Sequence, residues 1–510
     1  MLQAIDRFLD RTTMYRLTVY YLGTLIAIAM LFSAGHILSY NPLDIAISTA
    51  AALAACLIGN EIAAAVFGAT VNTESSTITA LIIVLLISPT YPTNIVAVVL
   101  ASGAAIASKY LLTIEKHHVF NPVAAGAVAL ALLTPFSATW WVGSPWMLPF
   151  VALGGYLIVR KTQREDMVAT FLLTFFTITT FAVLFTRPSF SSLMTAWVVG
   201  FVHSALIFFA TVMFTEPLTS PGTRGGRRWF ALATAILYAT PQVPLFGQVL
   251  TPEMALALAN FGAFLLWPHY RYTLTLAAKK LLAKDVYEFS FYLPEEKISY
   301  RPGQFMEWTL PHPKVDNRGN RRYFSLSSAP SEKTVSFAIK YYDPPSSYKR
   351  TLVALEPGGS IIATDVSGDF TLPKNLSQPL VFVAGGIGVA PFRSMLKAIV
   401  DRGERVNLTI LYVNRRADEI AYNDLFVRAA GLGIKTYYIL TDAKSLPPGW
   451  KGGVGHVDAK MIAQLVPEYA NSQFYLSGPQ PMVEAAASAL TNLSVPSQQI
   501  ITDFFPGYAM

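Results

Sequence analysis

The stretch Leu380–Pro391, with the sequence LVFVAGGIGVAP, decides the fold of the second half of the chain. Its first five residues are apolar and predict a buried strand, and Gly385, Gly386 and Gly388 predict a tight turn into a helix. Glycines let the backbone approach a ligand, and a helix start attracts anions, so the stretch indicates a dinucleotide site. The wider G-x-G-x-x-G pattern is not met because Pro391 takes its last place, and a tight turn without a ligand is the alternative.

A second strand that ends in a turn lies far downstream, at Phe474–Pro479. Its last residues are Ser477, Gly478 and Pro479, and Met482 then opens a helix. The apolar strands between the two turns alternate with amphipathic helices, which predicts a parallel sheet. Strand ends converge at the ligand crevice of a doubly wound sheet, so we expect the two turns to meet there.

The tetrapeptide Arg322-Tyr323-Phe324-Ser325 lies upstream of both turns. An arginine, an aromatic ring and a hydroxyl at this spacing suit a flavin dinucleotide. The arginine would pair with a phosphate in a charge-assisted contact. The aromatic side chain would cover one face of the flavin ring, and the serine would hydrogen-bond its edge. An ordinary strand is the alternative for this tetrapeptide.

Two further segments lie between the tetrapeptide and the glycine-rich turn. Thr334–Tyr341 alternates in the period of a strand and contains Lys340, a candidate cofactor ligand. Pro345–Lys349 leads into a predicted helix, where the hydroxyls of Ser346 and Ser347 and the free N–H groups can hold a pyrophosphate. The alternative is a plain N-cap with no ligand.

In this order the elements resemble the ferredoxin–NADP⁺ reductase family, in which a flavin-binding β-barrel precedes a nicotinamide-binding α/β domain. Arg322–Ser325 is similar to the R-x-[YF]-[ST] motif of that family, and Gly385–Pro391 to its G-G-x-G-x-x-P motif. Ser477–Met482 is similar to [CS]-G-P-x-x-M, and 503–508, DFFPGY, to the acidic-aromatic C-terminal end. The resemblance covers about residues 272–510.

The resemblance implies FAD and NAD(P)H as cofactors, with the nicotinamide docked against the flavin ring for hydride transfer. It implies an FAD-binding barrel over 271–375 and an NAD(P)-binding α/β domain over 376–510. Ser477 and Asp503 are the catalytic candidates, and they stand where many members carry Cys and Glu. The cofactor-binding candidates are Arg322, Tyr323, Phe324, Ser325, Lys340, Ser346, Ser347, Gly385, Gly386, Gly388, Pro391, Arg415, Gly478, Pro479, Met482 and Phe504.

Arg415 and Arg416 follow a predicted strand and could meet a 2′-phosphate, which would favour NADPH. A solvated surface pair is the alternative. The sequence is compatible with both NADH and NADPH.

The first half of the chain has a different composition, with long apolar runs that predict an all-α membrane domain over 1–270. The whole chain is 53% hydrophobic and only 14% charged. A crossing helix needs roughly 20 apolar residues, and we predict about ten spans, of which the third, fifth and ninth are short. The predicted spans are Leu17–Leu38, Leu43–Val66, Thr77–Ile87, Thr93–Leu112, Pro122–Leu133, Trp141–Ile158, Met167–Phe185, Leu193–Phe214, Phe230–Ala239 and Pro252–Leu266.

The basic residues gather in alternate loops between these spans, so an even number of spans places them on one side with both termini. The positive-inside rule makes that side cytoplasmic and predicts a multi-pass protein of the cell membrane (inner or plasma). The net charge of +7 therefore follows from membrane topology, and no nucleic-acid partner is expected. Cys56 is the only cysteine, which excludes intrachain disulfides and cysteine-ligated iron–sulfur clusters. No metal site is assigned.

The membrane half is similar to the B and D membrane subunits of the Nqr and Rnf redox complexes. The residues that carry this resemblance are Thr77–Leu81, Ser88-Pro89, Lys109, Val119–Pro122, Phe214–Pro217 and Thr219–Pro221. The covalent FMN motif of those subunits does not occur, so noncovalent FMN or riboflavin between the short spans is the preferred internal carrier. Thr73–Ser75 and Thr215–Pro217 are a faint sign of an inverted repeat. A single haem between His36 and His203 is the alternative carrier.

These features predict a transmembrane flavin oxidoreductase. Electrons would pass from cytosolic NAD(P)H through FAD into the membrane domain, and on to an extracytosolic flavoprotein or another extracytosolic or membrane acceptor. One alternative is redox-driven Na⁺ or H⁺ translocation, with Glu74 and Glu216 as ion ligands. A haem-containing ferric reductase is the other.

Overall fold

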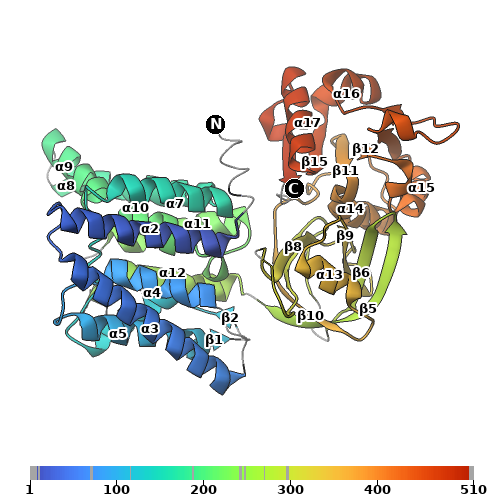
Figure 1. The fold of residues 1–510 in the computed structure, drawn as a ribbon. Helices are drawn as coiled ribbons and strands as arrows, with labels where there is room; N and C mark the ends of the chain where they lie inside the picture. The colour runs from blue at the N-terminus through green and yellow to red at the C-terminus, as the bar shows by residue number, and fades with distance from the viewer. Residues whose placement is uncertain are drawn as a thin grey trace. The chain divides into compact units, whose positions relative to one another are not determined.

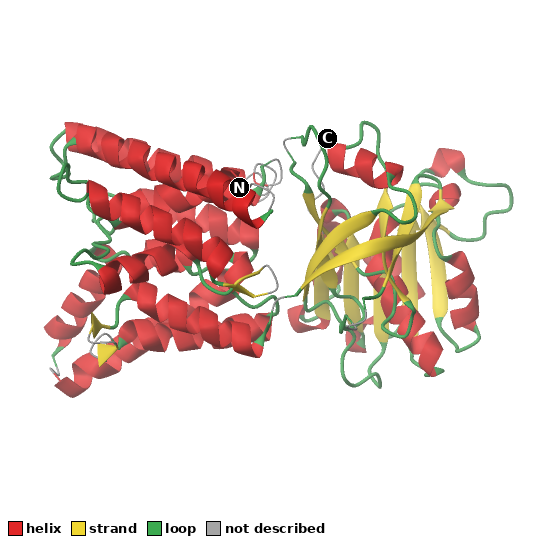
Figure 2. Ribbon diagram, turned by 90° about the horizontal axis from the view of Figure 1, so that it is seen from below, coloured by secondary structure: helices red, strands yellow, loops and turns green. Residues whose placement is uncertain are grey.

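The computed structural model describes residues 9, 12–68, 73–114, 117–186, 189–240, 244–245, 248–268, 270–294, 298–316 and 318–504. The chain divides into two compact units, Met1–Tyr270 and Arg271–Met510. Figure 1 follows the chain through both units, and Figure 2 shows that the first is built almost entirely of helices while the second contains the long strands.

The first unit is a helical bundle whose long apolar helices pack side by side (Figure 1). Its helices are α2 (Met14–Ala34), α3 (Pro42–Phe67), α4 (Thr73–Leu86), α5 (Ile95–Leu111), α6 (Pro122–Leu133), α7 (Leu148–Thr162), α8 (Glu165–Thr186), α9 (Phe190–Val202), α10 (Leu206–Phe208), α11 (Arg224–Ala239) and α12 (Pro252–Leu266). Between the helices, short strands form two small antiparallel pairs, β1 (Thr113–Ile114) with β2 (His117–His118) and β3 (Pro244–Leu245) with β4 (Gln248–Val249). The bundle core is aliphatic and aromatic.

Each predicted span overlaps helical residues of the described chain, and two of the differences in bounds and shape are large. Helix α7 begins at Leu148 rather than at Trp141, because Trp141–Met147 forms turns. The eighth predicted span is broken into α9 and a second segment, Leu206–Met213, with a bend of 55°. The second segment continues as a π-helix over Phe209–Met213, a rare geometry that hydropathy alone does not reveal.

The number of membrane crossings remains a prediction. Among the described residues, three helices are long and apolar enough to span a bilayer by length and composition: α2, α3 and α8. The count rises to four if the bent pair of α9 and Leu206–Met213 is one span. Helices α4, α5, α6 and α12 are apolar but shorter than 18 residues.

The second unit begins with a six-stranded antiparallel sheet that curls into a barrel. Its strands are β5 (Arg271–Ala283), β6 (Val286–Tyr292), β7 (Phe305–Thr309), β8 (Arg321–Ser325), β9 (Thr334–Lys340) and β10 (Ser360–Ser367). They lie in the order β8-β7-β10-β5-β6-β9, and a bridge between Leu326 and Phe337 joins the two edges. The interior is filled by aromatic side chains, among them Trp308 and Phe337 with ring centroids 4.4 Å apart. Helix α13 (Ser347–Ala354) packs on this core through the fully buried Tyr348.

A six-stranded parallel sheet follows, in the order β14-β13-β12-β11-β15-β16. Its strands are β11 (Leu380–Gly385), β12 (Leu408–Asn414), β13 (Lys435–Leu440), β14 (Gly453–Val454), β15 (Gln473–Gly478) and β16 (Ile500–Phe504). The intervening helices are α14 (Val389–Arg402), α15 (Asn423–Ala430), α16 (Ala459–Leu465) and α17 (Gln480–Asn492). Every residue of β11 is buried, as expected for a central parallel strand.

The strand order reverses between β11 and β15. From β11 the chain continues outward through β12, β13 and β14, and then returns to place β15 and β16 on the other side of β11. Ligands of open α/β sheets bind outside the carboxyl ends of the strands at such a switch point. The fold therefore indicates that a ligand would bind near the residues that end β11 and β15.

Candidate active site

The two turns predicted from the sequence do meet at the switch point. Strand β11 ends at Gly385 and β15 at Gly478, and Ala384 pairs with Ser477 in the parallel register. A short 3₁₀ turn, Gly386–Gly388, then leads from β11 into α14. The glycine-rich turn and the Ser477-Gly478-Pro479 turn thus form one surface at the carboxyl edge of the sheet.

Two of the glycines in this surface are explained by the structure, one by close packing and the other by its backbone conformation. A Cβ atom on Gly388 would lie 2.5 Å from the carbonyl oxygen of Ser477 and 2.6 Å from the Cα of Gly478. These are backbone atoms that cannot move aside. Gly386 has a φ of +52°, and the space beside it is open to at least 4 Å. Gly388 therefore holds the two turns together, while Gly386 leaves room over the turn.

Ser477 and Asp503 lie beside each other on β15 and β16 in the parallel register. Ser477 is fully buried, and neither its Oγ nor the buried Oδ2 of Asp503 has a hydrogen-bond partner within the described ranges. Burial raises the pKa of the Asp503 carboxyl to about 7. Phe504 pairs with Gly478 through the backbone. Its side chain and residues 505–508 of the predicted C-terminal motif lie outside the description.

Other predicted ligands pack around these turns. Pro391 is buried in the first turn of α14, and Pro479 caps the start of α17. Met482 lies against Gly385, since a Cβ atom on that glycine would clash with the Met482 sulfur.

Polar side chains from three elements lie near Gly386 and Ile387. Lys340, at the end of β9, forms an ion pair of 2.7 Å with Glu419, and both side chains are 13% exposed. Asn414 ends β12 and is 3% exposed. Neither of its amide atoms has a hydrogen-bond partner in the part of the chain that the structure describes. Lys340, one of the predicted cofactor ligands, thus lies near the glycine-rich turn.

The side chain of Arg322 reaches the helix α13, as a phosphate ligand there would. Its Cζ lies 5.0 Å from the centroid of the buried Tyr348 ring. Its Nη1 donates hydrogen bonds to the carbonyl oxygens of Arg318 and Gly319, at 2.7 and 3.1 Å. The Phe324 ring stacks on Phe337 with centroids 4.7 Å apart.

Tyr323 and Ser325 alternate with these residues and point to the other side of β8. Tyr323 is 50% exposed, and its hydroxyl donates to Glu307 at 2.7 Å. Ser325 is buried, and its hydroxyl lacks a partner among the residues described. A buried hydroxyl without a partner is costly and is a usual feature of a ligand site.

The start of α13 already holds a carboxylate from this chain. Ser346 caps the helix by accepting from the Lys349 N–H at 3.1 Å. The Ser347 N–H donates to Asp316 Oδ2 at 2.8 Å, and the Ser347 hydroxyl accepts from the Asp316 N–H at 3.0 Å. Burial and the nearby Arg322 and Arg318 lower the pKa of Lys349 to about 8. Basic side chains thus lie near the start of α13, where Asp316 accepts a hydrogen bond from the helix N–H of Ser347.

Arg415 and Arg416 lie at the outer end of the crevice, directly after β12. The Arg415 side chain is 73% exposed, and its Nε lies 4.0 Å from Asp442 Oδ2. Arg416 lies 3.3 Å from Asp418. An arginine beside a carboxylate at this position could meet either a 2′-phosphate or a free 2′-hydroxyl. The geometry is compatible with both nicotinamide cofactors.

The residues present fit a flavin dinucleotide and a nicotinamide dinucleotide. Three buried polar groups lack hydrogen-bond partners in the described chain and could bond a ligand: the hydroxyls of Ser325 and Ser477 and the amide of Asn414. The glycines at the switch point keep the turn free of side chains, and the basic groups near α13 suit a diphosphate.

Sequence reasoning missed Asn414, Glu419 and Asp316. Asn414 had a signal, because it is the polar residue that ends an apolar strand at the sheet edge where ligands bind. Glu419 and Asp316 lie in loops, and their roles depend on contacts with Lys340 and Ser347 that the sequence does not show.

Comparison with known proteins assigns this half of the chain. The family described as the oxidoreductase NAD-binding domain matches residues 382–488. The chain is 30% identical over 215 residues to the propane 2-monooxygenase reductase component of Mycolicibacterium goodii, covering 41% of this chain and 60% of that protein. It is 27% identical over 231 residues to a flavohemoprotein of Halalkalibacterium halodurans, covering 42% and 56%. An NADH-cytochrome b5 reductase 1 of Mortierella alpina is 27% identical over 285 residues, covering 51% and 93%.

The C-terminal half is therefore a ferredoxin–NADP⁺ reductase-like module that binds FAD and NAD(P)H. The relatives of this module are NAD(P)H-dependent FAD oxidoreductases. The chain spans about 60% of the length of the first two relatives. The matches cover at most about half of this chain, so they describe the reductase module.

Proposed function

We propose that the chain is a membrane-bound flavin oxidoreductase that carries electrons from NAD(P)H through FAD into its helical unit and on to an acceptor. The acceptor would be an extracytosolic flavoprotein or another extracytosolic or membrane compound. The protein would lie in the cell membrane as a multi-pass protein, with both termini on the cytoplasmic side. Noncovalent FMN or riboflavin would serve as the carrier inside the helical unit.

One observation carries the cytosolic part of the proposal. The glycine-rich turn after β11 and the Ser477 turn after β15 pack against each other at the switch point, and two adjacent buried polar groups remain without partners in the described chain. Orphaned polar atoms at a strand switch point support a ligand that satisfies them.

The residues of the chain would bind, orient and shield the two cofactors. Bound FAD supplies the acceptor for the hydride of NAD(P)H. Arg322 and the start of α13 would hold the diphosphate, and the Ser325 hydroxyl would bond the edge of the ring. The Gly386–Gly388 turn would receive the nicotinamide nucleotide, with Ser477 and Asp503 next to the reacting ring.

The helical unit supports the membrane part of the proposal. Three or four of its described helices suit a bilayer crossing, and many of the bundle's large apolar side chains are exposed, as lipid contact requires. A hydrocarbon core of about 30 Å is too wide for a single electron hop from a cytosolic FAD, so a carrier inside the unit is needed. His36 and His203 both lie at helix ends and are exposed, which favours a flavin over a haem.

Redox-driven ion translocation is the second candidate, and a buried polar cluster favours it. Glu216 Oε2 accepts hydrogen bonds from Asn121 at 2.8 Å and from Thr219 at 3.2 Å. Asn260, which is 1% exposed, donates to the Thr219 carbonyl at 2.9 Å. Carboxylates inside membrane bundles are costly and often functional. Glu74, the other predicted ion ligand, forms an ion pair with Arg16 at 2.9 Å.

The proposal is tested on the full chain purified in detergent and reconstituted into liposomes. We expect FAD together with a second, noncovalent flavin, no haem Soret band, and NAD(P)H oxidation that needs FAD. A Soret band would show that haem, rather than flavin, is the carrier inside the helical unit. A chain that binds no FAD would contradict the whole proposal. An NAD(P)H-driven Na⁺ or H⁺ gradient across the liposomes would favour the second candidate.

A further inference from the structure

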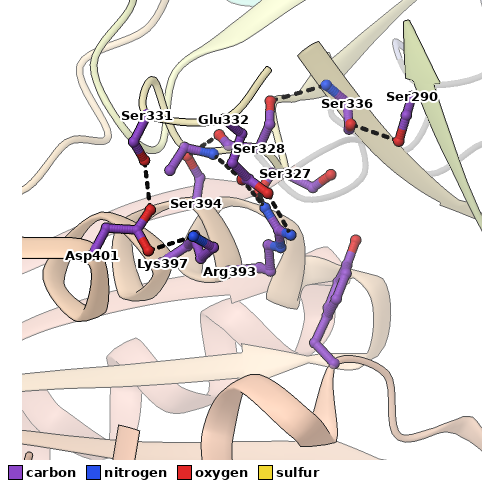
Figure 3. A network of polar contacts seen from close by, with 12 residues as sticks. Ser290, Ser327, Ser328, Ser331, Glu332, Ser336, Arg393, Ser394, Lys397 and Asp401 are labelled. Carbon is purple, nitrogen blue, oxygen red and sulfur yellow. Dashed lines mark hydrogen bonds and ion pairs between the residues drawn. The ribbon is translucent and has the colours of Figure 1, made fainter. Parts of the chain in front are cut away.

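Helix α14 is tied to the barrel by an ion pair between Arg393 and Glu332. Figure 3 shows Arg393 pointing from the helix toward the segment that joins β8 to β9. Its two terminal nitrogens pair with the two oxygens of Glu332, one of them at 3.0 Å. Two-point pairs of this kind fix geometry as well as adding energy. The side chains of Arg393 and Glu332 are only 15% and 22% exposed, so solvent screens the pair weakly.

The same arginine makes further contacts in this segment and beyond it. Its Nη1 donates to the Ser327 carbonyl oxygen at 3.0 Å, and its Cζ lies 5.6 Å from the centroid of the Tyr422 ring. The Tyr422 hydroxyl and the Ser327 hydroxyl both donate to Glu288, at 2.9 and 2.8 Å. The Arg393 guanidinium thus contacts Glu332, the Ser327 carbonyl oxygen and the Tyr422 ring, and these contacts restrict its position.

Ser394, the next residue, adds a second tie to the same segment. Its hydroxyl donates to the Ser328 carbonyl oxygen at 2.5 Å, and both residues are almost fully buried (Figure 3). Glu332 is also fixed from its own side, because its Oε2 accepts from the Ala329 N–H at 2.6 Å. These hydrogen bonds therefore connect the backbone of 327–329 directly to the first turns of α14.

The contacts between α14 and the 327–329 segment join the neighbourhoods of the two cofactor motifs. Ser327 comes two residues after Ser325, the last residue of the flavin tetrapeptide. Arg393 comes two residues after Pro391, which ends the glycine-rich motif. A displacement of α14 relative to 327–329 would change the separation between the strand that bears the flavin ligand and the turn that receives the nicotinamide.

We propose that Arg393, through its pair with Glu332, is a positioning residue that sets the distance between the flavin and the nicotinamide for hydride transfer. The proposal rests on the proposed function of this module. Hydride transfer depends steeply on alignment, and a displacement of about 1 Å can cost on the order of a hundredfold in rate. Arg393 would act without touching either reacting ring.

The same helix offers a matched control. Lys397 forms an ion pair with Asp401, and Asp401 Oδ2 accepts from the Ser331 hydroxyl at 2.6 Å (Figure 3). The Lys397–Asp401 pair lies within α14, and only the Asp401–Ser331 hydrogen bond reaches the β8–β9 segment. Neither Lys397 nor Asp401 contacts Ser327 or Ser328 in the described contacts. Removal of this pair takes away one ion pair from α14 without loosening the backbone next to the flavin motif.

The experiment compares Arg393→Gln, Glu332→Gln and Lys397→Gln in the full chain, together with Arg393→Lys. For each variant we would measure FAD content, NAD(P)H affinity and the rate constant of flavin reduction in anaerobic stopped flow. The flavin–nicotinamide charge-transfer band reports the stacking of the two rings directly. Arg393→Glu combined with Glu332→Arg tests whether the pair itself matters.

We expect Arg393→Gln and Glu332→Gln to retain FAD and to bind NAD(P)H within about threefold of the parent chain. Flavin reduction should slow at least tenfold, with a weaker charge-transfer band, and Arg393→Lys should recover part of the rate. Lys397→Gln should react like the parent. The proposal is overturned if both pair variants reduce flavin within twofold of the parent, or if Lys397→Gln slows it equally. A parent chain that binds FAD but is not reduced by NAD(P)H would contradict the proposed function instead.

Discussion

Ser477 and Asp503 occupy facing positions on the parallel strands β15 and β16, and each presents a buried polar atom for which the described chain provides no partner. The two strands are adjacent in space but come from segments with a helix between them, α17. The carboxyl end of β15 adjoins the turn that follows β11, and β16 lies on the other side of β15. This pair therefore stands where the proposed nicotinamide site needs one hydroxyl and one ionisable group.

The pKa of Asp503 predicts a pH dependence of flavin reduction. Burial raises that pKa to about 7, so the carboxyl is neutral below this pH and negatively charged above it. A negative charge beside the nicotinamide stabilises the positive charge that develops there as hydride leaves. We expect the reduction rate to rise about threefold to tenfold between pH 6 and pH 8, with an apparent pKa near 7. Stopped-flow measurements should show a flat profile for Asp503→Asn. An unchanged profile in this variant would assign the titration to another group.

Arg322 is expected to anchor FAD. Arg322→Gln should raise the dissociation constant for FAD at least tenfold, because a charge-assisted contact to a phosphate is lost. Arg321→Gln is the matched control, since Arg321 is the preceding residue and instead forms an ion pair with Glu307 at 3.3 Å. Titration of flavin-depleted protein with FAD, followed by flavin fluorescence, measures both. Equal losses in the two variants would argue that positive charge in general, rather than Arg322, holds the cofactor.

Asp316 is expected to compete with the FAD diphosphate at the start of α13. Burial acts to raise its pKa, but hydrogen bonds from the Ser347 N–H and from Arg318 outweigh this, so the pKa is lowered and the group is charged at neutral pH. Asp316→Asn removes the negative charge and keeps the size of the side chain. We expect FAD to bind about threefold to tenfold more tightly in this variant. Asp424→Asn, at a highly exposed position, should leave the affinity unchanged. Weaker FAD binding in Asp316→Asn would show that the carboxylate supports the site instead.

Arg415 is the residue placed to contact the 2′-phosphate that distinguishes NADPH from NADH. It lies after β12 with most of its side chain exposed, so a 2′-phosphate can reach it. Arg415→Ala should raise the KM for NADPH about tenfold and leave the KM for NADH within twofold. Steady-state rates with both cofactors decide the matter. If the substitution changes both KM values alike, or changes neither, Arg415 does not bind the 2′-phosphate.

The elements that follow from local sequence rules were predicted well. Helices α6 and α12 have their predicted ends because Asn121 and Thr251 cap them and a proline follows each cap. The strand–turn–helix around Gly385–Pro391 was also predicted, since an apolar run before glycines has few other solutions. The parallel sheet followed from the alternation of strands and helices.

Features that depend on tertiary contacts could not be predicted. The bend before Leu206 is invisible to hydropathy, because the two halves of the broken segment together are apolar enough to be taken for one span. The Asp316 contact at α13 and the Arg393–Glu332 pair join segments that are 31 and 61 residues apart in sequence. Arg393 did have a local signal in its place two residues after the glycine-rich motif, but its partner had none.

The central claim, that electrons from NAD(P)H cross the bilayer through this chain, is tested most directly with liposomes that contain trapped ferricyanide. NADH and NADPH are each added outside in separate anaerobic experiments, and only molecules with the reductase module facing outward can react. We predict that the trapped ferricyanide is reduced over many turnovers, and that Arg322→Gln abolishes this reduction. Complete reduction of the bound FAD while the trapped ferricyanide stays oxidised would contradict the account.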